Sequence, residues 1–145
     1  MPSAPPAGTV LAFDFGTQRI GVAVGETRLG LAHPLTTIAN AAAGQRHGAI
    51  EALITEWKPA LLVVGLPTHA DGAPHAMTVR ARRFARELED RFALPVMLCD
   101  ERFTTQVAAG ALREAGARGA RRKMGRDRVA AQLILQAYFD HRQPA

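Results

Sequence analysis

Hydrophobic residues in the first forty positions follow a pattern typical of closely spaced strands. The segments 9–15 (TVLAFDF), 20–26 and 29–38 are mostly apolar, and only a few polar or turn-forming residues separate them. The first segment is apolar on both faces, as in a strand at the centre of a sheet. Parallel neighbours need crossovers of a dozen or more residues. The short spacing therefore predicts three antiparallel strands.

The spacing of apolar residues changes after position 49. The positions that recur at the i, i+3, i+4 and i+7 interval of an amphipathic helix are Ile50, Leu53, Ile54 and Trp57. Pro59 ends this helix, and the apolar run 60–65 predicts a buried strand. The remaining predicted elements are a helix over about 74–92, a strand over 95–99, a helix from Thr104 or Thr105 to about Ala115, and a helix from about Arg126 to His141.

The order of these elements predicts an α/β fold with a mixed five-stranded sheet flanked by helices. Three closely spaced strands form an antiparallel meander, and two later strands join it in parallel through helical crossovers. A chain of 145 residues with 48% hydrophobic residues is long enough for one domain with one core. We expect residues 1–8 (MPSAPPAG) to form a flexible N-terminal tail and residues 9–145 to form that single domain.

The net charge of +5 is concentrated between Arg113 and Arg128. The seven basic residues of this segment are Arg113, Arg118, Arg121, Arg122, Lys123, Arg126 and Arg128. Only two acidic residues oppose them, and the rest of the chain has 11 basic and 11 acidic residues. Within the segment, the stretch GARGARRKMG is predicted as a basic loop. This local surplus favours contact with a polyanion, and from charge alone a solvated loop is an equally good interpretation.

Cys99 is the only cysteine, so no intrachain disulfide can form, which agrees with a reducing compartment. The first eight residues lack the basic and apolar regions of a signal peptide. No apolar run approaches the ~18 residues that span a bilayer. We therefore expect a cytoplasmic protein with no membrane partner.

Carboxylates occupy unusual positions in this pattern. Asp14 lies within the first apolar strand, where an uncompensated charge is costly. Asp100 and Glu101 directly follow the last predicted strand. Asp127 lies in the first turn of the last predicted helix, on the apolar stripe of that helix. Each of these elements can direct an acid toward the protein interior.

Three carboxylates that point inward from three elements repel one another unless a cation joins them. An all-oxygen set suits Mg²⁺ or Mn²⁺. Two such ions can activate a water and stabilise the leaving oxygen of a phosphodiester. Structural interpretations stay open beside this one, since Asp127 can be a helix cap and Asp100 and Glu101 can be surface residues at a strand exit.

Basic residues near these acids are candidates for binding phosphates. Arg19 follows the turn after Asp14, and it can equally be a structural salt-bridge partner. In that turn the small residues Gly16 and Thr17 leave room for a phosphate. The other candidates are Arg102, Arg118, Arg121, Arg122, Lys123 and Arg126. Acids for a metal and basic residues for a phosphate backbone together predict a nuclease.

Four motifs in this order resemble the YqgF family, also called RuvX. They are LAFDFGTQRIGVAVGE, VVGLP followed by Asp71 and Gly72, DERFTT, and DRVAAQLILQAYF. The resemblance covers the chain from about Thr9 to Phe139. Gln18 departs from the pattern, because many members have a lysine beside the arginine.

The resemblance implies an RNase H-like fold with strand order 3-2-1-4-5 and a metal-dependent phosphodiesterase site. By motif match, the acids of that site are Asp14, Glu101 and Asp127. The fifth strand lies two interstrand steps, or ~10 Å, from the first. The loop after the fifth strand must therefore curl back over Gly65 for Glu101 to share a metal with Asp14.

The leading hypothesis is a Mg²⁺-dependent endonuclease, with Mn²⁺ as an alternative metal, that processes the 5′ end of pre-16S ribosomal RNA in ribosome biogenesis. Its partners would be nucleic acid and ribosomal particles. The alternatives are a Holliday junction resolvase and a non-catalytic nucleic-acid-binding maturation factor. The sequence Asp-Phe-Gly-Thr also resembles a phosphate loop of the actin and sugar-kinase superfamily, whose members need two such domains. Junction resolution favours a homodimer because it takes two coordinated cuts, whereas RNA trimming can use a monomer.

Overall fold

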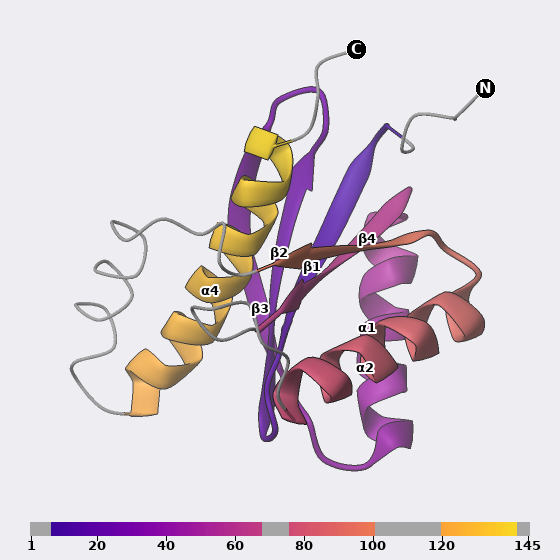
Figure 1. Ribbon diagram of the computed structural model, residues 1–145, viewed down its shortest axis with the longest axis vertical. Helices are drawn as coiled ribbons and strands as arrows, with labels where there is room; N and C mark the ends of the chain where they lie inside the picture. Colours follow the sequence, from indigo (N-terminus) through magenta and orange to yellow (C-terminus); the bar gives the residue numbers. More distant parts are fainter. Residues whose placement is uncertain (1–6, 68–75, 101–119, 142–145) are drawn as a thin grey trace.

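A computed structural model of the chain describes residues 7–67, 76–100 and 120–141. Five strands form one mixed sheet in the order β3-β2-β1-β4-β5 (Figure 1). The strands are β1 (Thr9–Phe15), β2 (Arg19–Glu26), β3 (Leu31–Ala39), β4 (Leu61–Leu66) and β5 (Val96–Asp100). The first three pair antiparallel, whereas β4 pairs parallel with β1, and β5 pairs parallel with β4. The predicted sheet and its strand order are confirmed.

Helices cover both faces of the sheet (Figure 1). The described helices are α1 (Ala43–Trp57), α2 (Ala76–Phe92) and α4 (Ala120–His141). Side chains of α1 and α2 share one buried cluster with Leu11 and Phe13 of β1. Side chains of α4 share a second cluster with Val10 and Ala12 of the same strand. Strand β1 is therefore buried from both sides, because its alternating residues enter two different cores.

Helix α4 begins at Ala120, six residues before the predicted start. Positions 120–125 thus belong to a helix, and their prediction as part of a basic loop was wrong. Alanine, arginine, lysine and methionine are strong helix formers, and the single Gly125 costs only about 1 kcal/mol relative to alanine. Helix α1 likewise begins seven residues earlier than its apolar spacing indicated. The predicted helix from 104 to 115, the tail over 1–6 and the loop over 68–75 lie outside the described residues.

Hydrogen bonds from α4 reach the edge strand β3. The amide nitrogen of Ala32 donates to Gln136 Oε1 at 3.0 Å, and Gln132 Nε2 donates to the Ala32 carbonyl at 3.1 Å. Gln136 Nε2 also donates to the carbonyl of Gly30 at 2.8 Å. These bonds satisfy backbone groups next to the sheet edge. In the described parts of the chain, no helix is long and apolar enough to span a membrane.

Candidate active site

The carboxyl ends of the three parallel strands meet at one edge of the sheet. The register pairs Phe13 with Val64 and Gly65 with Cys99, so Asp14, Gly65 and Cys99 lie at the same level across β1, β4 and β5. On the other side, Asp14 pairs with Gly21 of β2. In open α/β sheets this edge is where ligands bind.

Strand alternation places Asp14 on the face that α4 covers. Its neighbours at intervals of two, Val10 and Ala12, belong to the α4 cluster. Asp14 is half-buried, and the residues level with it on both adjacent strands are glycines, Gly21 and Gly65. The two positions directly level with this acid therefore carry no side chain.

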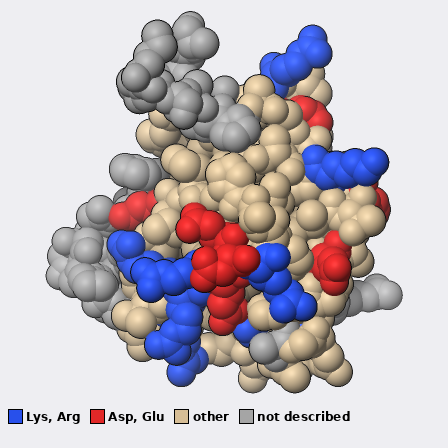
Figure 2. All heavy atoms as spheres, turned by 90° about the vertical axis from the view of Figure 1, so that its right-hand side faces the viewer, with Lys and Arg blue, Asp and Glu red and all other residues tan. Residues whose placement is uncertain are grey.

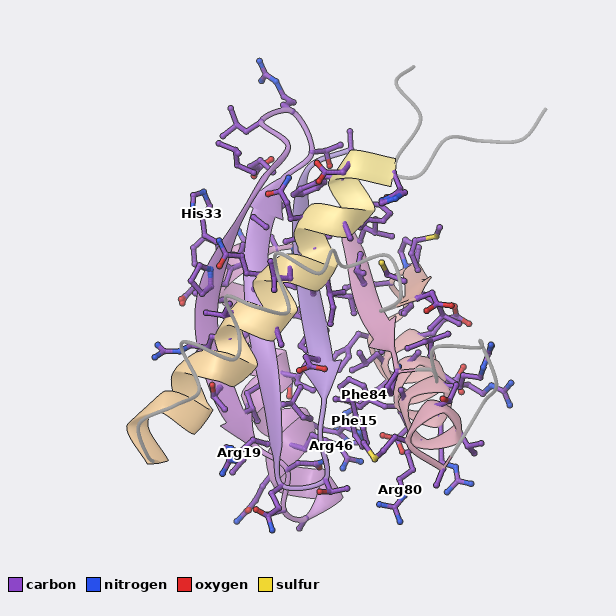
Figure 3. All side chains as sticks on the ribbon, turned by 60° about the vertical axis from the view of Figure 1, so that its left-hand side comes forward. Phe15, Arg19, His33, Arg46, Arg80 and Phe84 are labelled. Atoms are coloured by element: carbon purple, nitrogen blue, oxygen red, sulfur yellow. The ribbon has the colours of Figure 1, made fainter. Side chains whose placement is uncertain are left out.

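Arg19 lies on the same face as Asp14. It precedes Ile20, which belongs to the opposite cluster with α1 and α2, so the alternation turns Arg19 toward α4. Figure 3 shows Arg19 at the end of the β1–β2 hairpin. Asp100 differs, because Cys99 belongs to the α4 cluster and Asp100 therefore faces α2. Of the sequence-predicted residues with described side chains, Asp14 and Arg19 share one face.

The turn between β1 and β2 is tightly closed. A Cβ added to Gly16 would lie 2.5 Å from the carbonyl oxygen of Arg19, so only glycine fits there without a backbone shift. Asn40 Nδ2 donates to the Gly16 carbonyl at 2.6 Å, and the Asn40 amide donates to the Gln18 carbonyl at 2.9 Å. The side of Gly16 on which a Cβ would lie is thus filled by the turn backbone, and room for a phosphate at Gly16 and Thr17 stays a prediction.

A polar network links this turn to α1 and α2. Arg46 Nη1 donates to Asn40 Oδ1 at 2.7 Å, and Arg46 Nη2 lies 3.0 Å from Glu87 Oε2. His47 Nε2 lies 3.3 Å from the same Glu87 oxygen. Sequence analysis did not single out Asn40, Arg46 or Glu87. No motif marks them, since their partners come from distant segments.

The other predicted residues are described only in part. Glu101, Arg102 and Arg118 lie outside the described residues. The residues of α4 for which only the backbone is described include Arg121, Arg122, Lys123, Arg126 and Asp127. Within residues 7–67, 76–100 and 120–141, no group of three or more His, Cys, Asp or Glu side chains could hold a metal ion. A metal shared by the three predicted acids therefore stays a prediction.

The start of α4 lies at the same end of the molecule as the β1–β2 turn (Figure 1). Ala131 and Ile134 are buried against the sheet, and position 127 comes four residues before Ala131. Residues four apart lie on the same face of a helix. The backbone of α4 thus places position 127 on the sheet-facing side.

Cys99 is a buried side chain of the α4 core. It is 8% exposed, and its Sγ lies 3.7 Å from the carbonyl oxygen of Ile134, to which the thiol donates. This environment is typical of a small core residue and not of a nucleophile.

Comparison with protein families gives a match over almost the whole chain. A family model described as RuvX, Holliday junction resolvase, matches residues 8–141. A protein of Nitrosospira multiformis named "Putative pre-16S rRNA nuclease" is 56% identical over 140 residues, which cover 97% of this chain and 93% of that protein. A protein of Thiobacillus denitrificans with the same name is 53% identical over 145 residues, the full length of both chains.

Solved structures support the same architecture. The structure described as T. thermophilus RuvC in complex with Holliday junction substrate superposes with a TM-score of 0.57 at 15% identity, over 90% of this chain and 94% of that chain. The yeast mitochondrial Holliday junction resolvase superposes with a TM-score of 0.56 at 10% identity, over 94% of this chain and 80% of that chain. At such identities the likeness shows the fold alone, and it confirms the expected RNase H-like fold.

Proposed function

The chain belongs to the RuvX family of Holliday junction resolvases, and from this premise we propose that it is a metal-dependent endonuclease acting on structured nucleic acid. Its proposed reaction is hydrolysis of a phosphodiester bond at the 5′ end of pre-16S ribosomal RNA. The names of full-length relatives support this substrate. The observation that carries the reaction is Asp14, a half-buried acid at the end of the central strand, flanked by glycines and on the same face as Arg19.

The residues present fit a divalent metal. Asp14, Glu101 and Asp127 would hold it, because carboxylate oxygens are the ligands that Mg²⁺ and Mn²⁺ prefer. When bound, the metal would supply electrophilic activation of the phosphodiester and a hydroxide at neutral pH. The protein contributes a central strand buried on both sides, which fixes the backbone of Asp14.

Strand alternation favours Glu101 over Asp100 as the second acid. Asp100 faces α2, on the side of the sheet opposite to Asp14. Gly65 lies between β1 and β5 at this level and carries no side chain, so a loop can pass over it toward Asp14.

Phosphates of the substrate would contact Arg19, Arg102 and the basic residues at the start of α4. Arg19 is well placed for this role because it lies on the face of Asp14. The α4 residues proposed to contribute are Arg121, Arg122, Lys123 and Arg126, with Arg118 before the helix. A precursor of ribosomal RNA as substrate implies a cytoplasmic protein that works on ribosomal particles.

Replacement of the central acid tests the nuclease proposal. Asp14→Asn keeps the shape of the side chain and removes its charge, so we expect cleavage to be lost while nucleic-acid binding stays near normal. The assay presents a pre-16S RNA fragment and a four-way DNA junction side by side, with Mg²⁺, Mn²⁺ or a chelator. The matched control is Asp90→Asn, an exposed acid on α2, which should cut like the wild type.

Full activity of Asp14→Asn, or cleavage that survives the chelator, would contradict the proposal. Binding without cleavage by the wild type under all metal conditions would favour the non-catalytic maturation factor instead. Junction resolution is the second candidate function, because the matching family model is described by that activity. Preferential cutting of the four-way junction by a dimer would support it over RNA processing.

A further inference from the structure

A pocket of about 220 Å³ opens on the face of the sheet opposite to Asp14. It lies between the end of β1 and the first turns of α2, and its lining residues are Phe15, Arg46, Arg80, Arg83, Phe84 and Glu87. Figure 3 shows Phe15, Phe84 and Arg46 gathered between the sheet and α2, with Arg80 beyond them at the same end. Nothing in the proposed cleavage chemistry uses this pocket.

Aromatic rings form the apolar wall of the pocket. Phe15 is half-buried, and its ring centroid lies 4.9 Å from that of Phe84 at an interplanar angle of 35°. Phe84 is only 1% exposed, and Phe13 contacts it edge-on at 5.8 Å. One side of the Phe15 ring therefore rests on the packed core.

Positive charge surrounds the aromatic wall. The guanidinium of Arg46 lies 5.9 Å from the centroid of the Phe84 ring and forms an ion pair with Glu87. Arg80 and Arg83 are exposed, and neither forms an ion pair with any residue that the structure describes. The pocket thus combines an inner arginine that is paired with Glu87 and two exposed arginines that form no ion pair with a described residue, which favours an anionic ligand.

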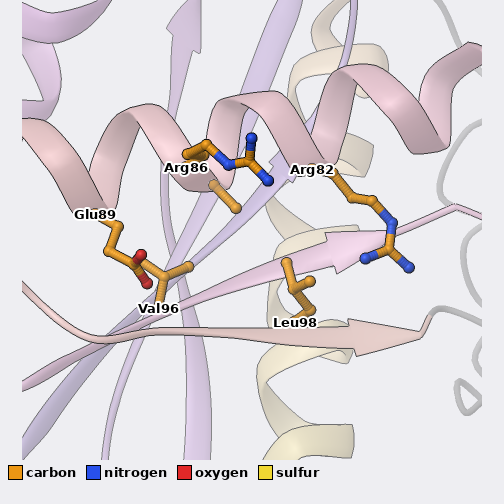
Figure 4. Close-up of a pocket in the computed structure, with 6 residues that line it drawn as sticks. Arg82, Arg86, Glu89, Val96 and Leu98 are labelled. Carbon is orange, nitrogen blue, oxygen red and sulfur yellow. The ribbon is translucent and has the colours of Figure 1, made fainter.

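The basic character is local to the first turns of α2. Four arginines precede the first acid of this helix, Glu87. Figure 2 shows the resulting mixture of basic and acidic side chains on the face formed by α1 and α2. A second pocket of about 180 Å³ lies between α2 and β5 (Figure 4), and the described residues that line it, among them Arg82, Arg86, Glu89, Val96 and Leu98, include no aromatic one. Among the described lining residues of these two pockets, arginine and phenylalanine occur together in the first.

The aromatic pocket lies close to the proposed cleavage site. Phe15 directly follows Asp14, and the two side chains point to opposite faces of β1. Thr78 Oγ1 donates to the carbonyl of Pro67, which fixes the start of α2 to the end of β4. The two sites are thus separated by the thickness of a single sheet, and a nucleic-acid strand that passes around this end of β1 can reach both within a few nucleotides.

We propose that this pocket binds an unpaired nucleobase of the substrate, stacked on Phe15, while Arg80 and Arg83 bind the adjacent phosphates. Aromatic rings accept any base by stacking, and arginine provides the charge that tracks the backbone. The inference rests on the proposed nuclease function and adds a structural requirement for the substrate. The substrate must have an unpaired nucleotide beside the cleaved bond, as in a loop or at a branch point.

A coupling experiment between protein and substrate tests this pocket. The protein is the Asp14→Asn variant, in which we expect binding without cleavage. It is compared with the double variant that also carries Phe15→Leu. The probe is a branched oligonucleotide, prepared once as RNA and once as DNA, with one abasic site moved across the nucleotides around the cut. We expect one position where loss of the base weakens binding about ten-fold, and where Phe15→Leu removes that difference.

A fluorescent base and a pair of neighbouring arginines give independent readings. With 2-aminopurine at the sensitive position, stacking on Phe15 should change its fluorescence on binding, and Phe15→Leu should abolish the change. Arg83→Ala should weaken binding several-fold, whereas its neighbour Arg82→Ala, which lines the other pocket, should not. The arginine pair keeps the test decisive if Phe15→Leu does not fold, as judged by its thermal unfolding.

The pocket proposal would be overturned if the abasic site and Phe15→Leu weakened binding independently of each other. It would also be overturned if Arg82→Ala and Arg83→Ala weakened binding equally. If Asp14→Asn cuts like the wild type, the nuclease assignment itself is wrong. If Asp14→Asn is inactive but shows no coupling, only the pocket proposal is wrong. Coupling with the RNA probe alone or the DNA probe alone identifies which nucleic acid the pocket accepts.

Discussion

Asp14 and Phe15 are neighbours in the sequence and serve opposite faces of the sheet. The acid faces α4 between two glycines, and the ring faces α2 against Phe84. Because side chains alternate along a strand, a single end of β1 supplies both a candidate metal ligand and a candidate stacking surface. A one-residue shift in register would exchange them and bury the acid in the α1–α2 core.

Gly16 is required by the turn that follows this pair. Gly16→Ala would bring a Cβ to within 2.5 Å of the Arg19 carbonyl, so we expect a loss of about 2 kcal/mol in the free energy of unfolding. The measurement is urea denaturation.

Gly48→Ala is the matched control for this substitution. Gly48 lies inside α1, and a Cβ there meets nothing within 4 Å, so alanine should stabilise the protein by roughly 0.5–1 kcal/mol. Equal effects of the two substitutions would show that the close approach in the β1–β2 turn has no energetic cost.

At the level of elements, the turn after Asp14 is held from outside the hairpin. Asn40 connects the Gly16 carbonyl to Arg46 of α1, and Arg46 connects to Glu87 of α2. Partly buried polar groups paired in this way restrict a backbone that a short turn alone would leave free to move. Helices α1 and α2 thus position the end of β1 from one face of the sheet, whereas Asp14 at that end points to the other face.

Helix α4 is attached to the edge strand by glutamines as well as by its apolar stripe. Gln136→Ala removes the partners of the Ala32 amide and the Gly30 carbonyl, and we expect a loss of about 1–3 kcal/mol in the free energy of unfolding. Arg128→Ala, an exposed position on the same helix, should change it by less than about 0.5 kcal/mol. Calorimetric or urea unfolding of both variants checks this, and a negligible effect of Gln136→Ala would mean that water replaces its bonds.

For the whole molecule, the charge surplus coincides with the end that holds Asp14. The start of α4 lies at the end of the β1–β2 turn (Figure 1), and the arginines of α2 lie in its first turns. Of the exposed basic side chains that the structure describes, Arg28 in the β2–β3 hairpin and Lys58 after α1 lie at the opposite end. A polyanion is therefore drawn toward the strand ends.

The salt dependence of binding measures this asymmetry. The slope of log affinity against log salt is negative. Replacing Arg121, Arg122 and Lys123 together by alanine should make it shallower by about 0.9 for each duplex phosphate that the variant no longer neutralises. The matched control, Arg28→Ala with Lys58→Ala, should leave the slope unchanged. An equal change of slope in both variants would show that binding depends on the net charge of the protein and not on where the basic residues lie.

The sequence by itself determined the sheet, its strand order through the resemblance, and the burial of β1 on both faces. These features depend on short-range spacing, because alternation and helical periodicity are written in consecutive residues. It also singled out Asp14, since a charged residue within an apolar run has no local explanation. The predicted start of α4 was wrong because the segment contains both strong helix formers and glycines that favour a loop. The local sequence does not settle which of these two tendencies wins.

Only the tertiary structure decided which side chains meet. Asn40, Arg46 and Glu87 come from three segments, and nothing in their local sequence indicates a shared network with Gly16. The face of Asp14 and the pocket beside Phe15 likewise follow from register and from the helix that covers each face. Periodicity fixes the alternation along one strand, whereas contacts between distant segments depend on how whole elements pack.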